Sequence, residues 1–285
     1  MNSYVRGVSF INSEIGFLID RDKLYGTTDG GNKWVEVGAI SARKDEYFIE
    51  NCFFIDALHG WAVGSAWREP TASEPNPPLY EGAVLATTDG GRTWSPQRLS
   101  LPKRHPAAGS KWSLNNVLFI TDKKGWAIGD GVILWTLDGG AAWHPAAVKD
   151  KDAIGDYKTI SFADDKFGWV TMKDTADYLI TTDAGQNWRR VDGPAPFLGP
   201  STDLTFLTQE HGFAICVRLY ETFDGGRKWK LREVAGRGNE TEYRLIRRLR
   251  DGTLTVFFFE DNKLAVAISV DDGQTWSVRI SEVHK

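Results

Sequence analysis

The sequence lacks most of the features that would assign a function at once. Among its 285 residues there are only two cysteines, Cys52 and Cys216, and both lie within apolar runs. We therefore expect two buried thiols rather than a disulfide or a metal site. No CxxC or HExxH spacing occurs and the five histidines are scattered, so neither a metal nor a cofactor is expected. No apolar run approaches the ~20 residues of a membrane-spanning helix, and no segment sustains the period of an amphipathic helix.

An excess of charge of one sign is also lacking, since the net charge is only −4. This argues against a nucleic-acid partner bound through bulk charge. The N-terminal segment MNSYVRGVSF has neither a basic n-region nor a long apolar h-region. We expect a soluble, cytoplasmic monomer for the chain as given, or an extracytoplasmic protein if a leader was removed.

What the sequence does contain is glycine, tryptophan and a repeat. Its 12 tryptophans and 29 glycines, against 2 methionines, favour β-structure with many tight turns. One eight-residue motif, T-x-D-x-G-x-x-W, recurs six times at intervals of 41 to 60 residues. The copies are TTDGGNKW at 27, TTDGGRTW at 87, TLDGGAAW at 136, TTDAGQNW at 181, TFDGGRKW at 222 and SVDDGQTW at 269.

Two further markers repeat in phase with this motif. A glycine-aromatic segment, GWAVG at 60 in its fullest form, precedes five of the copies, and a strand-like segment ending in an aromatic precedes the marker. Each unit predicts four short strands, at 114–120, 125–128, 132–136 and 142–147 in the third. The connections are too short for crossover helices, so neighbouring strands must be antiparallel.

Repeated four-stranded antiparallel sheets of this length are the blades of a β-propeller. We predict an all-β, six-bladed propeller that forms a single domain over residues 1–285. Its blades are expected at about 4–38, 47–98, 112–148, 156–192, 201–234 and 242–281. The sixth unit lacks the glycine-aromatic marker, yet the first and sixth units are both complete, so we expect closure by packing rather than by exchange of a strand between the termini.

The repeated motif predicts a structural role for itself. Its aspartate and threonine can accept hydrogen bonds from backbone N–H groups just ahead, its second glycine supplies a positive φ, and its tryptophan packs on the sheet. TTDAGQNW replaces the first glycine but keeps the second, so the second position is the demanding one. One aspartate per blade spaces the carboxylates too widely for a metal or a catalytic pair. The structural residues are Asp29, Trp34, Asp89, Trp94, Asp138, Trp143, Asp183, Trp188, Asp224, Trp229, Asp271 and Trp276.

This motif resembles the Asp-box, or BNR repeat, of sialidases, some glucanase propellers and the ten-bladed sorting receptors. The alternation of GWAVG with T-x-DGG-x-x-W is most similar to the photosystem II stability/assembly factor-like propellers, over residues 4 to 280. The resemblance implies a propeller of the sialidase-like superfamily. Because that family includes a photosynthetic assembly chaperone, it also implies protein binding. Such propellers often have seven blades, whereas six units occur here.

A ligand of a propeller is expected at the mouth of the central funnel, where the inner strands start. Alignment of the units on their markers places five residues there: Arg6, Glu50, Asn115, Lys158 and Thr202. The residue after each of them is a second mouth position, and in the fifth unit this residue is Asp203. The sixth unit adds Arg244, Arg247, Arg248 and Arg250. Guanidinium forks suit carboxylates and phosphates, so an anionic ligand or an acidic peptide is one interpretation. The alternative is that these arginines pair with Glu50, Asp203, Glu240 or Glu242, or point into solvent.

An insertion at 65–82 provides a second candidate surface, on the same side as the funnel mouth. Trp67, Arg68 and Tyr80 are residue types enriched in binding hot spots. The alternative is a loop that folds back to cover apolar surface. A further loop at 100–112, with Lys103, Arg104, His105 and Trp112, could form the neighbouring wall.

Two classes of function remain. We predict a non-catalytic scaffold that binds a protein or peptide, with acidic groups facing the arginines, through its funnel face and the loop 65–82. The alternative is a glycoside hydrolase, sialidase- or glucanase-like, which needs two carboxylates facing each other across a cleft. Glu50 and Asp203 are the only opposed acidic pair in the aligned ring, and no tyrosine–glutamate pair for a sialidase follows from the repeats.

Overall fold

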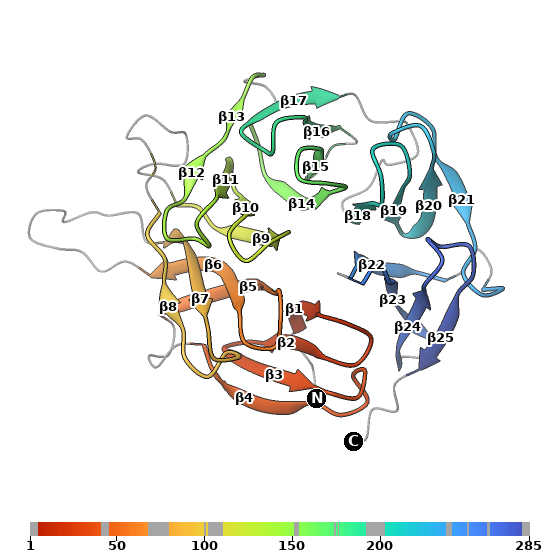
Figure 1. Cartoon of the computed structure of the whole chain (residues 1–285), viewed down its shortest axis with the longest axis horizontal. Helices are drawn as coiled ribbons and strands as arrows, with labels where there is room; N and C mark the ends of the chain where they lie inside the picture. Colours follow the sequence, from red (N-terminus) through yellow and green to blue (C-terminus); the bar gives the residue numbers. More distant parts are fainter. Residues whose placement is uncertain are drawn as a thin grey trace, which may run out of the picture. The chain divides into compact units, whose positions relative to one another are not determined.

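The computed structural model describes residues 5–40, 46–67, 80–99, 101, 111–150, 154–173, 175, 177–191, 203–237, 241–249, 251–260 and 263–280. These residues form β-strands and turns, with no helix among them (Figure 1). The chain divides into two compact units, Met1–Tyr157 and Lys158–Lys285, which are described separately.

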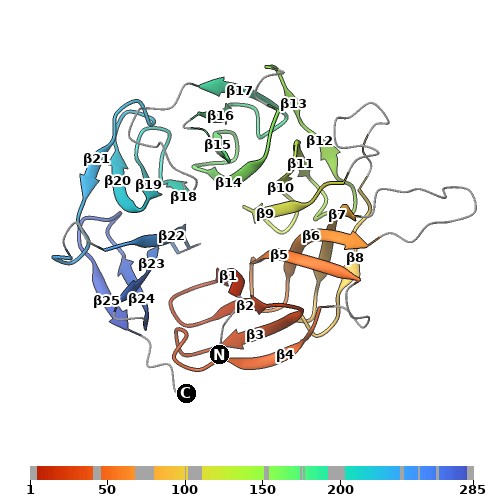
Figure 2. The same ribbon diagram turned by 180° about the vertical axis from the view of Figure 1, so that it is seen from behind.

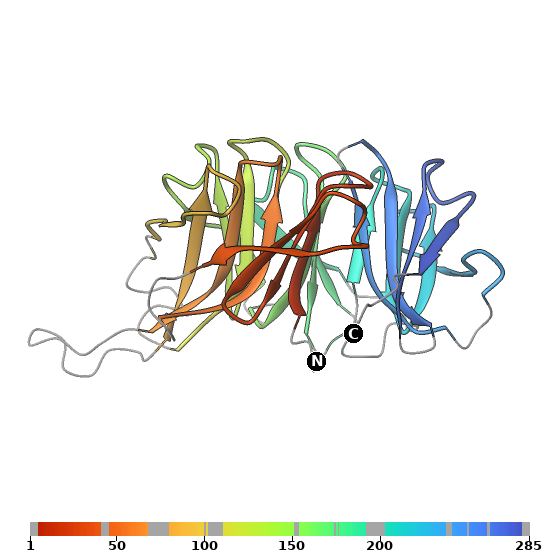
Figure 3. The same ribbon diagram turned by 90° about the horizontal axis from the view of Figure 1, so that it is seen from below.

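The first unit contains three four-stranded antiparallel sheets, each built from consecutive strands. The first sheet has β1 (Val5–Phe10), β2 (Gly16–Asp20), β3 (Lys23–Thr27) and β4 (Val35–Ala39). The second has β5 (Tyr47–Phe54), β6 (Gly60–Trp67), β7 (Tyr80–Thr87) and β8 (Ser95–Pro96). The third has β9 (Leu114–Phe119), β10 (Gly125–Gly129), β11 (Val132–Thr136) and β12 (His144–Pro145). The short β13 (Ala147–Val148) follows in the chain and is not part of this sheet. The Asp-box turns of these sheets gather at one end of the unit, and the inner strands start at the other (Figure 3).

The second unit repeats this arrangement (Figure 2). Its first sheet has β14 (Tyr157–Phe162), which begins on the last residue of the first unit, β15 (Gly168–Met172), β16 (Tyr178–Thr181) and β17 (Asn187–Val191). The next has β18 (Asp203–Phe206), β19 (Gly212–Cys216), β20 (Arg218–Thr222) and β21 (Lys230–Arg232). The last has β22 (Tyr243–Arg248), β23 (Leu254–Glu260), β24 (Lys263–Ser269) and β25 (Ser277–Ile280).

The predicted fold class, an all-β, six-bladed propeller with four antiparallel strands per blade, is confirmed. The strands predicted for the third blade match β9 to β12 closely, although the fourth strand is two residues long rather than six. The single-domain boundaries stay a prediction.

The Asp-box turn has the predicted hydrogen bonds in all six copies. In the first copy, the Thr27 hydroxyl donates to Asp29 Oδ1 at 2.8 Å and accepts from the Gly31 N–H at 3.0 Å, while Asp29 Oδ1 accepts from the Lys33 N–H at 2.9 Å. The other five boxes repeat these three bonds. Both central positions have positive φ in every box, but only the second is always glycine. The sequence therefore identified the demanding position correctly.

In each of the first five blades, one phenylalanine at the end of the inner strand contacts both the glycine of the glycine-aromatic marker and the box tryptophan. In the second blade this residue is Phe54, whose ring lies so close to Gly60 that a Cβ there would be 2.6 Å away. The box Trp94 packs edge-on against Phe54 at 6.0 Å, and Phe17, the marker aromatic of the preceding blade, stacks on it at 3.7 Å. The same stack joins Trp61 to Phe119 in the first unit and Trp169 to Phe206 in the second. The core of each unit therefore lies between successive sheets.

The two cysteines differ in burial. Cys52 is buried in the core between the first two blades, which raises the pKa of its thiol to about 12. Cys216 is only partly buried, because it lies at the end of β19. Both thiols are free, as predicted, but the expectation of two fully buried thiols was wrong for Cys216. In the described ranges, no helix is long and apolar enough to cross a membrane.

Candidate functional site

The residues predicted to line the funnel mouth coincide with β-bulges at the start of the inner strands. The pairing register with the next strand slips by one residue at Arg6, Glu50, Asn115 and Arg244. A bulged residue is left out of the ladder, so its side chain is re-aimed relative to its neighbours. Sequence alignment found these positions without the reason for them.

In the first unit, two bulged residues of neighbouring blades form an ion pair. Arg6 Nη1 lies 2.7 Å from Glu50 Oε1, and both side chains are about 40% exposed, at 40% and 41%. Burial raises the pKa of the Glu50 carboxyl, an effect that Arg6 opposes and Asp130 reinforces. The positive charge of Arg6 is therefore already compensated by Glu50.

In the second unit, Asp203 is a buried acceptor that links three blades. Its carboxylate accepts from the Ile246 N–H at 2.7 Å, from Arg247 Nη1 at 2.7 and 2.9 Å, and from the Thr159 hydroxyl at 3.2 Å. Arg244 pairs with Glu242 at 2.7 Å. The ion pairs that the sequence offered as the alternative to ligand binding are thus present for Arg6, Arg244 and Arg247.

Arg248 lies at the other end of the inner strand from the predicted mouth. It pairs across the sheet with Leu254, which corresponds to the pairing of Phe54 with Gly60 in the second blade. The arginine therefore stands where the first five blades have the central phenylalanine, and its Nη1 donates to the Leu207 carbonyl at 3.0 Å. Its placement at the funnel mouth was wrong, because the missing marker left the sixth unit without an alignment.

Lys158, the mouth residue of the fourth blade, lies near Cys216. The ammonium group opposes the rise in the pKa of the thiol that burial causes. Between Cys216 and the exposed Arg218, the strand connection consists of Val217 alone, which has a φ of 63° and is 54% exposed. A β-branched residue in this conformation is strained, and strained positions cluster at functional sites.

An aromatic cluster lies where β6 and β7 leave the second blade. Trp67 and Tyr80 are paired across the strands, and their rings meet edge-on at 5.3 Å. Phe48, at the start of the inner strand, packs edge-on against Tyr80 at 5.3 Å, and the Lys111 ammonium lies 4.6 Å above the Tyr80 ring. We call Phe48, Trp67, Tyr80 and Lys111 the aromatic cluster. Sequence reasoning identified Trp67 and Tyr80 but missed Phe48 and Lys111.

Trp112 is not part of this exposed surface. Its side chain is 5% exposed and covers Gly82, where a Cβ would lie 2.1 Å from the indole ring. It belongs to the core between the second and third blades, so the expectation that it forms a loop wall was wrong. Arg68, Arg250, Thr202, Glu240 and the loop residues Lys103, Arg104 and His105 lie outside the described residues.

The fold and these surfaces define a β-propeller of Asp-box blades with polar and aromatic residues at the ends of its strands. A family model described as photosynthesis system II assembly factor YCF48 matches residues 108–200, which span the third and fourth blades. The resemblance predicted from the alternating markers is therefore confirmed. No match was found among curated proteins.

Solved structures share the fold over nearly the whole chain. YCF48 bound to a D1 peptide is 19% identical, with 97% of this chain and 82% of that chain covered and a TM-score of 0.61. YCF48 from Cyanidioschyzon merolae is 15% identical, with 98% and 95% covered and a TM-score of 0.51. A virginiamycin B lyase from Staphylococcus aureus is 12% identical, with 100% and 86% covered and a TM-score of 0.62. At these identities the likeness concerns the fold, which hosts both peptide binding and lyase chemistry, so function has to be argued from residues.

Proposed function

We propose that this chain is a non-catalytic propeller that binds a protein or peptide partner, with the aromatic cluster as part of the contact surface. The exposure of Trp67 carries the proposal. All twelve tryptophans are described, and Trp67 is the only exposed one, at 39%. A large ring packed against Tyr80, which itself packs against Phe48, contributes contact area at little cost in side-chain entropy, which is typical of binding hot spots.

Two further observations support a peptide-like partner. Lys111 over Tyr80 adds a positive charge to the aromatic cluster, so the surface offers both apolar contact and attraction for acidic groups. A protein of the same fold, YCF48, has been solved with a bound peptide. In this proposal an acidic group of the partner faces Lys111, while the ion-paired Arg6, Arg244 and Arg247 serve mainly to hold neighbouring blades together. A cytoplasmic location belongs to the same proposal.

The alternative, a glycoside hydrolase, has less support from the residues. Asp203 accepts hydrogen bonds from three groups and is 5% exposed, so proton transfer by this carboxyl would break the contacts that join its blades. Glu50 is the better candidate, because its carboxyl is partly exposed and its pKa is raised by burial.

A pull-down with matched baits tests the proposed surface. The variant Trp67→Ala/Lys111→Ala removes the exposed ring and the cation of the aromatic cluster. Phe223→Ala is the control, since it removes an exposed ring, 62% exposed, from the fifth blade. We expect a protein from the lysate of the source organism to be retained by the wild-type and control baits and lost from the double variant.

Identical recovery by all three baits would rule out the aromatic cluster as the contact surface. Turnover of a glycan that is lost in Glu50→Gln would favour the hydrolase instead. Thermal unfolding of each bait distinguishes a lost contact from a lost fold.

A further inference from the structure

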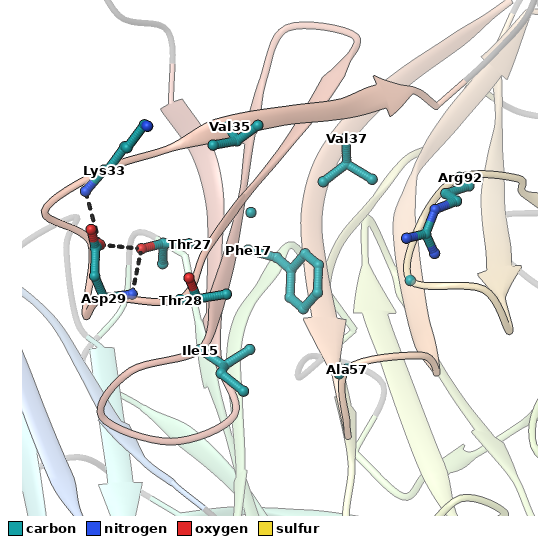
Figure 4. Close-up of a pocket in the computed structure, with 12 residues that line it drawn as sticks. Ile15, Phe17, Thr27, Thr28, Asp29, Lys33, Val35, Val37, Ala57 and Arg92 are labelled. Atoms are coloured by element: carbon teal, nitrogen blue, oxygen red, sulfur yellow. Dashed lines mark hydrogen bonds between the residues drawn. The ribbon is translucent and has the colours of Figure 1, made fainter.

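A cavity on the outer part of the first blade is distinct from the surfaces described above. It has a volume of about 340 Å³ and lies at the Asp-box end, between the first blade and the box turn of the second (Figure 4). Its walls are apolar side chains of the first blade: Ile15, Phe17, Val35 and Val37. Pockets for small ligands or side chains begin at roughly 300 Å³, so the cavity has the volume for one ring-sized group.

The cavity exists because the first blade lacks a side chain that every other blade has. Gly26 directly precedes the box threonine, and the equivalent residues of the other blades are Ala86, Trp135, Ile180, Glu221 and Ile268. The extended backbone at Gly26 does not demand glycine, and a Cβ there would meet Val37 at 3.3 Å. Gly26 therefore opens space without being required for the turn.

The third blade shows what fills this place. Trp135 pairs across the sheet with His144, and their rings lie 4.7 Å apart. In the first blade the equivalent pair is Gly26 and Val35, and Val35 is 57% exposed. An indole-sized group from another molecule could thus take the position that Trp135 occupies in its own blade.

The fifth blade fills the same place with polar groups. There the equivalents of Ile15 and Gly26 are His211 and Glu221, which are hydrogen-bonded at 3.0 Å. The first blade has no such polar pair among its described cavity residues, and the face of Phe17 borders the space instead. An aromatic ring is the group that such a wall favours.

The charges at the rim are mainly positive. Arg92 extends from the second blade towards the cavity, and Lys33 stands at its other side (Figure 4). Arg92 uses one donor on the Asp89 carbonyl at 2.6 Å, and a guanidinium has four more. Asp29 is the one acid among the described residues that line the cavity, and its carboxylate already accepts from the Lys33 N–H and the Thr27 hydroxyl.

We propose that this cavity binds an aromatic side chain from an extended segment of a partner protein, with an acidic residue beside it that contacts Arg92. The site is a second binding site, at the end of the first unit opposite the aromatic cluster. It does not depend on the function proposed for that cluster, since no residue is shared between the two.

Three blocked peptides separate the two parts of the proposal: acetyl-Gly-Trp-Glu-Gly-amide, its Gln analogue, and acetyl-Gly-Ala-Glu-Gly-amide. Binding is followed by NMR titration of the labelled full-length protein. We expect the Trp-Glu peptide to bind about two- to fivefold more tightly than the Trp-Gln peptide, the effect of one exposed ion pair. The Ala-Glu peptide should not bind measurably.

Two variants localise the binding. Gly26→Trp fills the cavity with the side chain of the third blade and should abolish binding. Arg92→Gln should remove the preference for the acidic peptide, so that the Trp-Glu and Trp-Gln peptides bind equally, and the proposal stays testable even if Gly26→Trp does not fold. The proposal is overturned if neither tryptophan peptide binds saturably, if a folded Gly26→Trp binds as well as wild type, or if the acidic preference survives in Arg92→Gln. These results do not depend on the pull-down, so a failure of Trp67 to bind a partner would leave them unchanged.

Discussion

Ala184 and Asp272 are the two side chains at a box position that is otherwise glycine. Their φ angles are 64° and 56°, in the left-handed region that costs an L-residue about 1–2 kcal/mol. The second position, Gly185 in the same box as Ala184, has a φ of 79° and its N–H donates to the Thr181 hydroxyl at 2.9 Å. The chain thus tolerates strain at one position of the turn but not at the other.

Replacing Ala184 with glycine should therefore stabilise the fold. We expect Ala184→Gly to raise the free energy of unfolding by about 1 kcal/mol, because relief of the left-handed conformation outweighs the extra freedom of glycine in the unfolded chain. Urea denaturation measures the change. The control is Ala142→Gly in the third box, where φ is not positive, and there the substitution should be neutral or destabilising. Equal effects of both substitutions would refute the strain at Ala184.

The box could be predicted from sequence because its interactions are local. The bonds of Thr27, Asp29 and Gly31 lie within one turn, so residue types at fixed spacing determine them. The ion pairs of Arg6 and Arg247 join residues 44 apart in the chain. Sequence could offer those pairings only as one alternative among several, since each depends on which blades are neighbours.

At the scale of elements, strand β6 contains one tryptophan for each role. Trp61 is 4% exposed, stacks on Phe119 of the next blade at 3.5 Å and donates to the Gly139 carbonyl at 3.0 Å. Trp67, at the other end of the same strand, is 39% exposed. The glycine-aromatic marker therefore joins neighbouring blades. In the sequence it was visible only as a repeated pattern, because the ring on which its aromatic stacks lies in the following repeat.

The two tryptophans should differ sharply in their effect on stability. We expect Trp61→Ala to lower the free energy of unfolding by about 3–5 kcal/mol, the usual cost of truncating a buried aromatic. Trp67→Ala should cost about 1 kcal/mol or less, since its side chain is 39% exposed and lies at the end of β6 rather than in the core between blades. Chemical denaturation of both variants gives the comparison. Similar losses would mean that Trp67 supports the blade rather than a contact surface.

The sixth blade shows where sequence reasoning failed and why. Arg248 was placed at the mouth, yet the register puts it opposite Leu254 at the box end. With no phenylalanine there, Phe213 of the fifth blade packs directly on the box Trp276 at 6.3 Å. The sixth unit lacks both the glycine-aromatic marker and the phenylalanine that packs on it. Its inner strand therefore could not be aligned with those of the other units. The cavity at Gly26 was missed for the opposite reason, since an absent side chain is visible only when the blades are compared in register.

At the scale of the whole molecule, the six boxes share one electrostatic property. The pKa of each box carboxyl is lowered, to about 2 at Asp89 and Asp271, where a threonine hydroxyl and N–H both donate to the carboxylate. The other lowered groups are Asp29, Asp138, Asp183 and Asp224, and at Asp183 burial opposes the hydrogen bonds that lower the pKa.

Because the pKa of each box carboxyl is lower in the folded protein than in the unfolded chain, the stability of the fold decreases in acid. An unfolded aspartate titrates near 3.9, so these carboxylates contribute their full stabilisation above about pH 4 and lose it as the pH falls towards about 2. We expect the free energy of unfolding to be nearly constant from pH 6 to about pH 4 and to fall steeply below that, measured by urea denaturation at a series of pH values. Asp89→Asn/Asp271→Asn should be less stable than wild type at pH 6, with a shallower fall and a difference that narrows towards pH 2. Parallel curves for wild type and the double variant would show that the boxes hold the blades by shape alone, whereas convergence would show that the ionised turns, repeated once per blade, supply stability that the propeller loses in acid.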